Sequence, residues 1–168
     1  MVKQAFAELE MVETLVRGAA EDAPPARIAA SDLYAYARGD KSQALEIKEA
    51  LLRNPSLRAA LRRMVETTAR YQMPEAIAAS TDDFPERRAE GCRVRMERSR
   101  AEDDQYYLIV ELAEGMDAPS VLTLCDPEDR FERVELPPAR RGVIQVTVTT
   151  ESGVPAMLRD PKTAVFLG

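Results

Sequence analysis

The amino-acid sequence predicts an α+β protein, with an N-terminal module of four helices followed by an antiparallel β-sandwich of about six strands. Up to residue 80, apolar residues recur three and four positions apart, which is the spacing of an amphipathic helix. From Cys92 onward they alternate with polar residues, which is the pattern of a half-buried strand. Residues 81–91 are polar and contain proline and glycine. We therefore expect a linker there, between a helical domain at residues 1–80 and a β-domain at residues 91–168.

Glycines mark the ends of the first two expected helices. Residues 1–18 carry one apolar stripe, which stops at Gly18. After a linker with two prolines, the hydroxyl of Ser31 is suited to cap a second helix, and Gly39 is suited to end it.

The third and fourth expected helices have clear start signals. Asp40, with Gln43 three residues later, has the spacing of a capping box. Asn54 and Pro55 mark the start of the fourth helix, whose apolar positions extend to Tyr71. We expect the buried side of the third helix to be formed by five apolar residues: Leu45, Ile47, Ala50, Leu51 and Leu52.

The β-domain is expected to contain no helix, because short apolar or alternating segments follow one another with only turn signals between them. Such turn signals are Glu114-Gly115 and Pro137-Pro138. The expected strands lie at residues 92–97, 106–113, 121–125, 131–136, 143–150 and 163–167.

The composition argues against an enzyme. The chain contains no histidine, which excludes Ser-His-Asp and Cys-His catalysis and every histidine-ligated metal site. It has no glycine-rich phosphate loop. The acidic residues of 103–104 and 126–129 fall in predicted turns, where Asp accepts hydrogen bonds from nearby backbone amides. We expect no catalytic residues, no cofactor and no metal.

The charge argues against nucleic acid and membrane as partners. Residues 1–80 carry 11 basic and 11 acidic residues, and residues 81–168 carry 12 and 18, so the second segment holds the whole net charge of −6. An acidic chain is a poor binder of phosphate backbones. The apolar runs are far shorter than the ~18 residues that span a bilayer, and residues 1–18 lack the order of a signal peptide. We expect a cytoplasmic protein.

The two cysteines, Cys92 and Cys125, fall on the apolar phase of expected strands, where a reduced thiol packs as a small apolar group. The sequence leaves open whether they form a disulfide. Residues 87–100 contain six arginines. They fit either a strip that docks an anion or partner, or the solvent face of an edge strand, and we favour the edge strand.

Two stretches resemble anti-sigma factors of the zinc-less kind. Residues 32–64 are similar to anti-sigma domains, which have a Tyr-x-x-Gly helix stop, a break before proline and a Pro-x-Leu-x-x-x-Leu helix start. The residues that match are Leu33, Tyr36, Gly39, Leu51, Asn54, Pro55, Leu57 and Leu61. Residues 144–168 are similar to the end of anti-sigma-K factors, at Val146, Thr147, Gly153, Thr163, Val165, Leu167 and Gly168. Most such factors have a membrane span between the two domains. This chain has the polar residues 81–91 there, so the resemblance implies a version without the span.

The resemblance implies a non-catalytic regulator of transcription, whose helical segment binds a sigma factor or a similar protein. The expected partner-binding residues are Leu33, Tyr34, Tyr36, Leu57, Leu61 and Met64. An alternative is a β-sandwich module that binds a ligand or builds an assembly, with the helices used to form a homodimer. The sequence leaves two alternatives equally open for residues 1–18: the helix packs on its own chain, or it packs on a second copy or a partner.

Tyr34 is the most informative of these positions. On a helix it lies about 100° from Leu33 and about 200° from Tyr36, so the two tyrosines cannot both point into one small core. We expect one of them to be exposed, and we expect Tyr34 to anchor the partner.

Overall fold

The computed structural model describes residues 28–74 and 84–168, which form helices and two antiparallel β-sheets. The expected α+β class is therefore confirmed. The chain divides into two compact units, Met1–Thr68 and Ala69–Gly168. This division falls before the segment 81–91 in which we expected the linker. The first expected helix, residues 1–18, lies outside the described residues.

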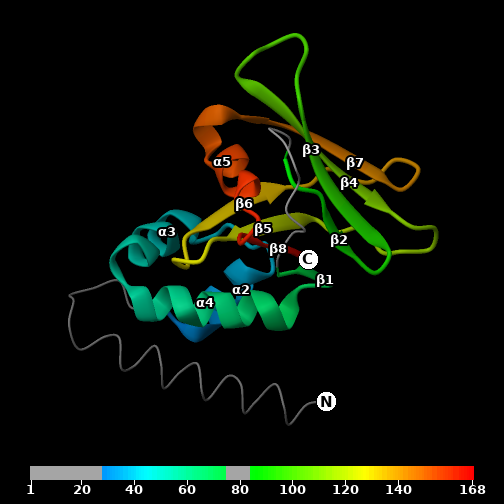
Figure 1. Ribbon diagram of the computed structural model, residues 1–168. Coiled ribbons are helices and arrows are strands. Elements are labelled where there is room, and N and C mark those ends of the chain that lie inside the picture. The colour runs from blue at the N-terminus through cyan, green and yellow to red at the C-terminus, as the bar shows by residue number, and fades with distance from the viewer. Residues whose placement is uncertain (1–27, 75–83) are drawn as a thin grey trace. The chain divides into compact units, whose positions relative to one another are not determined.

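The described part of the first unit contains three helices, drawn in blue to green in Figure 1. They are α2 (Ala30–Ala37), α3 (Ala44–Arg53) and α4 (Pro55–Thr68). Helix α4 packs against both α2 and α3. Each helix has a buried stripe, such as Leu57, Leu61 and Met64 on α4, because residues three and four apart lie on the same face of a helix.

Two helix boundaries follow the signals in the sequence. Helix α2 ends before Gly39, whose φ of +108° is a conformation that favours glycine. The backbone N–H of Leu57 donates to the side-chain oxygen of Asn54 at 3.1 Å, so Asn54 caps α4 and Pro55 occupies its first position.

Two other capping predictions are wrong. Helix α2 begins at Ala30, so Ser31 lies inside the helix and does not cap it. The N-cap residue is Ala29, whose side chain forms no capping hydrogen bond. Asp40 accepts a hydrogen bond from the backbone N–H of Ser42 at 2.7 Å, while α3 begins only at Ala44. Asp40 thus stabilises a turn before the helix, which is the local alternative that an Asp side chain offers the backbone.

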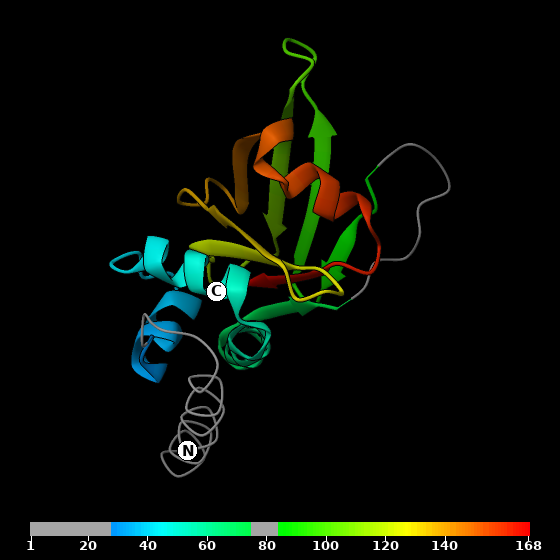
Figure 2. The same ribbon diagram turned by 90° about the vertical axis from the view of Figure 1, so that its left-hand side faces the viewer.

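The second unit contains two antiparallel sheets of four strands each in its described part. The first has the order β1-β8-β5-β6, from Tyr71–Met73, Ala164–Leu167, Val121–Cys125 and Phe131–Glu135. The second has the order β2-β3-β4-β7, from Arg87–Ala89, Cys92–Arg98, Gln105–Leu112 and Val143–Thr149. Figure 2 shows the same ribbon turned by 90° about the vertical axis.

The six expected strands are found, but the second unit holds more than these. Strands β1 and β2 are additional, and Tyr71 belongs to β1 instead of the fourth helix. A 3₁₀ turn (Thr150–Ser152) and helix α5 (Val154–Arg159) stand between β7 and β8, where we expected no helix.

Both sheets contribute to one apolar core. Leu122, Leu124 and Val165 come from the first sheet, and Leu108 and Val110 from the second; all five are fully buried. Helix α5 adds Val154 and Leu158 to the same core. Cys92 and Cys125 are both buried and form no disulfide in this structure, which agrees with the apolar packing expected for them.

Candidate functional site

The structure separates the six expected partner-binding residues into two groups. Five of them are buried: Leu33, Tyr36, Leu57, Leu61 and Met64. Only Tyr34 is exposed, at 37% of its surface, while Tyr36 retains 4%. The geometric prediction for the two tyrosines is thus confirmed. The five buried side chains support the helical packing and cannot touch a partner while this packing persists.

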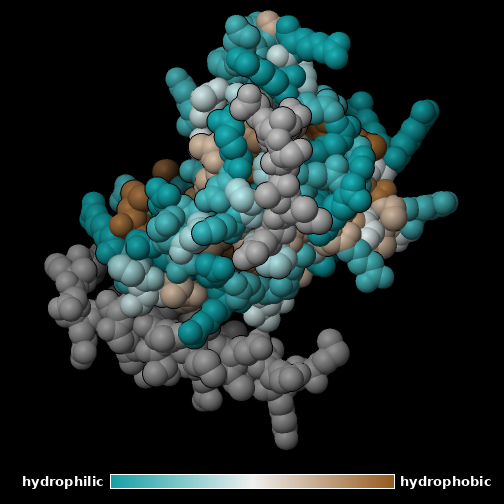
Figure 3. Space-filling model, viewed as in Figure 1, coloured by the Kyte–Doolittle hydropathy of each residue, from teal (hydrophilic) through white to brown (hydrophobic). Residues whose placement is uncertain are grey.

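The most exposed apolar side chains in the described part of the chain are two leucines on α3. Leu45 is 77% exposed and Leu52 is 82% exposed, whereas Ile47 and Leu51 of the same helix are buried. Leu45 and Leu52 are seven residues apart, which places them on one face of the helix two turns apart. We call them the α3 leucine pair. Figure 3 shows hydrophobic atoms at the surface over α3.

We had expected both leucines on the buried side of the third helix, and this expectation is wrong. A helical wheel contains the signal that contradicts it. Leu45 lies about 200° from Ile47 and about 240° from Leu51, while Leu52 returns to within about 20° of Leu45. One side of a short helix cannot cover both groups, so one group had to face outward.

Charged side chains surround these exposed apolar positions. Lys48 and Glu49 lie between the members of the α3 leucine pair and are exposed. On α2, the guanidinium carbon of Arg38 lies 6.0 Å from the centre of the Tyr34 ring, at the limit of a cation–π contact. An apolar centre with a charged rim is the usual composition of a protein-binding surface.

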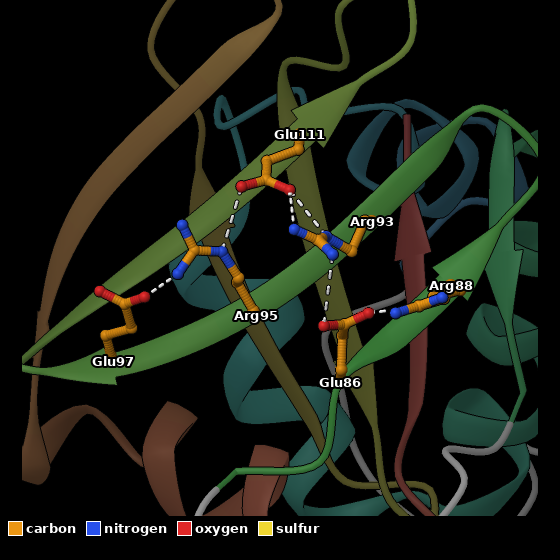
Figure 4. Close-up of polar contacts among 6 residues, drawn as sticks. All are labelled: Glu86, Arg88, Arg93, Arg95, Glu97 and Glu111. Atoms are coloured by element: carbon orange, nitrogen blue, oxygen red, sulfur yellow. Dashed lines mark hydrogen bonds and ion pairs between the residues drawn. The ribbon is translucent and has the colours of Figure 1, made fainter.

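The arginines of residues 87–100 do not form a free cationic strip. Glu111 of β4 contacts Arg93 at 2.6 Å and Arg95 at 3.1 Å, both on β3 (Figure 4). Glu86 pairs with Arg88 and lies 3.7 Å from Arg93. Burial acts to raise the pKa of Glu111, but the hydrogen bonds and charges of the two arginines outweigh it and lower the pKa.

The edge-strand interpretation holds for Arg88 on β2 but not for the arginines of β3. The edge of this sheet is β2, and β3 lies between β2 and β4. The residues of β3 therefore form cross-strand ion pairs on a sheet face, where opposite charges on neighbouring strands attract. Paired in this way, they are poor candidates for holding a phosphate.

Arg87 has a structural role instead. Its side chain is only 1% exposed, and it donates hydrogen bonds to the backbone oxygens of Asp160 at 2.6 Å, Pro161 at 2.8 Å and Leu158 at 3.4 Å. These carbonyls lie at and just beyond the end of α5, where helix carbonyls lack partners of their own. Burial lowers the pKa of Arg87, partly offset by Asp160.

The acidic turn at residues 126–129 satisfies its own backbone, as expected. One carboxylate oxygen of Asp126 accepts hydrogen bonds from the N–H groups of Glu128 at 2.9 Å and Arg130 at 2.8 Å. Among residues 28–74 and 84–168, no group of three or more Asp, Glu, Cys or His residues is placed to hold a metal ion. None of the helices described has both the length and the apolar character needed to cross a bilayer.

Two exposed apolar positions remain as candidates on the helical unit: the α3 leucine pair and Tyr34. Large exposed apolar side chains of this kind are suited to binding another protein. No protein family, curated protein or solved structure matches this sequence.

Proposed function

We propose that this chain is a non-catalytic regulatory protein that binds a sigma factor, or a protein with a similar helical surface, through its helical unit. The observation that carries the proposal is the exposure of the α3 leucine pair. Large apolar side chains that are almost fully exposed and share one helix face are typical of a protein-binding surface. The resemblance of residues 32–64 to anti-sigma domains indicates the class of partner.

The binding energy would come from a few anchors. Burying a leucine side chain contributes roughly 1.5–3 kcal/mol, so the α3 leucine pair offers several kcal/mol if both side chains enter the partner. Tyr34 adds an aromatic ring with a polar end, which is a frequent interface anchor. The buried residues Leu33, Tyr36, Leu57, Leu61 and Met64 would act indirectly, by fixing the helices that present these anchors.

The mechanism we propose is steric. A helix of the chain that covers the sigma surface required by core RNA polymerase would prevent assembly of the holoenzyme. Such inhibition needs no chemistry and no cofactor, which agrees with the absence of histidine from the sequence. The location we propose is the cytoplasm, because core polymerase is there.

The test is a titration of the purified chain against each sigma factor of the source organism, by calorimetry and by competition with core polymerase. We expect one sigma factor to bind and to be withheld from core polymerase. The double variant Leu45→Ser/Leu52→Ser should weaken that binding by at least about tenfold. The control is Met116→Ser, which removes an exposed apolar side chain from the second unit. This variant should bind like wild type. If no sigma factor binds the folded protein, the proposal is wrong.

A further inference from the structure

The two sheets of the second unit end in four edge strands, and three of these are protected. Strands β1 and β2 have three residues each, and β2 carries the exposed Arg88. Three of the five residues of β6 are charged. Short length and charge are the usual ways in which proteins keep an edge from pairing with another chain. Strand β7, Val143–Thr149, is the exception, with seven residues and no charged side chain.

The hydrogen bonds at both ends of β7 identify which of its backbone groups are free. The N–H of Leu112 donates to Gly142 at 2.7 Å, and the N–H of Thr150 donates to Asp104 at 2.9 Å. Because bonded positions alternate along an antiparallel pair, Ile144, Val146 and Val148 bond to β4. The intervening residues, Gln145, Thr147 and Thr149, therefore direct their N–H and C=O groups away from β4.

Within the described part of the chain, the backbone groups of Gln145 and Thr147 have no partner, whereas the C=O of Thr149 accepts a hydrogen bond from the hydroxyl of Ser152 at 2.7 Å. Strand β7 ends the order β2-β3-β4-β7 (Figure 1). Val143 is also occupied, because its N–H and C=O bond to Arg140 at 3.0 and 2.8 Å. The side chains of Gln145, Thr147 and Thr149 are exposed. An uncharged edge on which Gln145, Thr147 and the N–H of Thr149 offer unused backbone groups is suited to receive another strand.

We propose that the occupant of this edge is β7 of a second copy, paired antiparallel about a two-fold axis at Thr147. Thr147 then faces Thr147 of the second copy, and Gln145 faces Thr149 in both directions. Each of these pairs exchanges two backbone hydrogen bonds. The two sheets become one sheet of order β2-β3-β4-β7-β7-β4-β3-β2. The contact is the same from both sides, as in most homodimers.

The charges that flank β7 favour this partner and this direction. Arg140 and Arg141 precede the strand, Glu151 follows it, and all three are exposed. Antiparallel pairing of two copies brings the basic end of one strand to the acidic end of the other, whereas parallel pairing would place like charges together. Within the strand no charge opposes another, and Thr–Thr contacts across strands are favourable.

The experiment uses the full chain and two variants with opposite charges at the axis. We expect sedimentation velocity to show wild type at twice the chain mass at micromolar concentration. Thr147→Lys and Thr147→Glu should each be monomeric, because each places two like charges face to face. An equal mixture of the two variants should restore the dimer mass. Position 147 bonds outward, so neither substitution removes a hydrogen bond to β4.

The matched control is Thr67→Lys, the same change at an exposed threonine of α4, which should remain dimeric. Far-ultraviolet circular dichroism should be the same for all variants. A monomeric wild type would overturn the proposal. So would a dimer that persists in both Thr147 variants, or a mixture of the two that stays monomeric although each variant is folded.

Discussion

Tyr34 and Tyr36 lie two positions apart on α2, yet substitution should affect them in opposite ways. Tyr36→Ala should lower the free energy of unfolding by about 3 kcal/mol, because a buried ring leaves a cavity. Tyr34→Ala should change it by less than about 1 kcal/mol, since the side chain is exposed, and should weaken partner binding by about 2 kcal/mol or more. Urea unfolding and calorimetry measure the two effects. A Tyr34→Ala protein that unfolds would assign this residue to the core.

Loss of the Arg87 side chain should markedly lower the free energy of unfolding of the second unit. Arg87→Met keeps the volume and removes the charged donors to three carbonyls near the end of α5. We expect a loss of about 3 kcal/mol in the free energy of unfolding, because hydrogen bonds from a charged group are strong and the carbonyls of Leu158 and Pro161 lose this donor. Arg88→Met, on the exposed side of the same strand, is the control and should stay within about 0.5 kcal/mol. Equal losses in both variants would contradict the role of Arg87.

Cys92 should give the protein a stability that depends on pH. Burial raises the pKa of its thiol from the ordinary value of 9.0 to about 11. Between these values the unfolded chain loses a proton that the folded chain keeps, so the stabilisation is complete below pH 9 and is lost as the pH rises toward 11. Over this range wild type should lose about 1–2 kcal/mol more than Cys92→Ala. Tyr71, whose pKa burial also raises, remains in both proteins. Parallel pH profiles from denaturant titrations would contradict the prediction.

At the scale of elements, the sequence was informative where a local interaction decides the structure. Gly39 and Asn54 could be assigned because a positive φ and a cap each depend on a few neighbouring residues. Helix α5 also had local signals, namely Gly153 at φ +76° and Pro155 in the first helical turn, although we expected no helix in the β-domain.

Other elements depend on contacts that no local pattern contains. Strands β1 and β2 have only three residues each, too few for a period to be recognised. They form because β8 and β3 supply a pairing edge, and β8 is some ninety residues from β1 along the chain. The free edge of β7 could not be predicted either, since an edge exists only once the strand order is known.

The cap of α4 gives a prediction at this scale. Asn54→Ala should lower the free energy of unfolding by about 1 kcal/mol, because the N–H of Leu57 loses its partner at the start of the helix. Asp40→Ala removes an exposed turn hydrogen bond ahead of α3 and should cost less. Helix content and urea unfolding of the two variants check the difference. The reverse order of the two losses would show that Asp40 is the more important start signal.

For the whole molecule, the division at Thr68 predicts which fragment can fold alone. A fragment of residues 69–168 keeps every strand of both sheets and the Arg87 contacts, and it should unfold cooperatively. A fragment of residues 91–168, which starts where we had placed the β-domain, lacks β1 and β2, so β8 and β3 each lose one of their two neighbouring strands. It should melt at a lower temperature or without a cooperative transition. Circular dichroism melting curves compare the two, and equal stability would contradict the division.

The central claim is that the helical unit, through the exposed face of α3, receives a sigma factor. Hydrogen–deuterium exchange of the full chain, alone and saturated with the sigma factor identified by the titration, tests this claim most directly, because it reports on every segment at once. We predict slower exchange in peptides that cover residues 30–53, which hold Tyr34 and the α3 leucine pair. Exchange in peptides from β3 to β7 should be unchanged. Protection confined to residues 87–168, with residues 30–53 unaffected, would contradict the account.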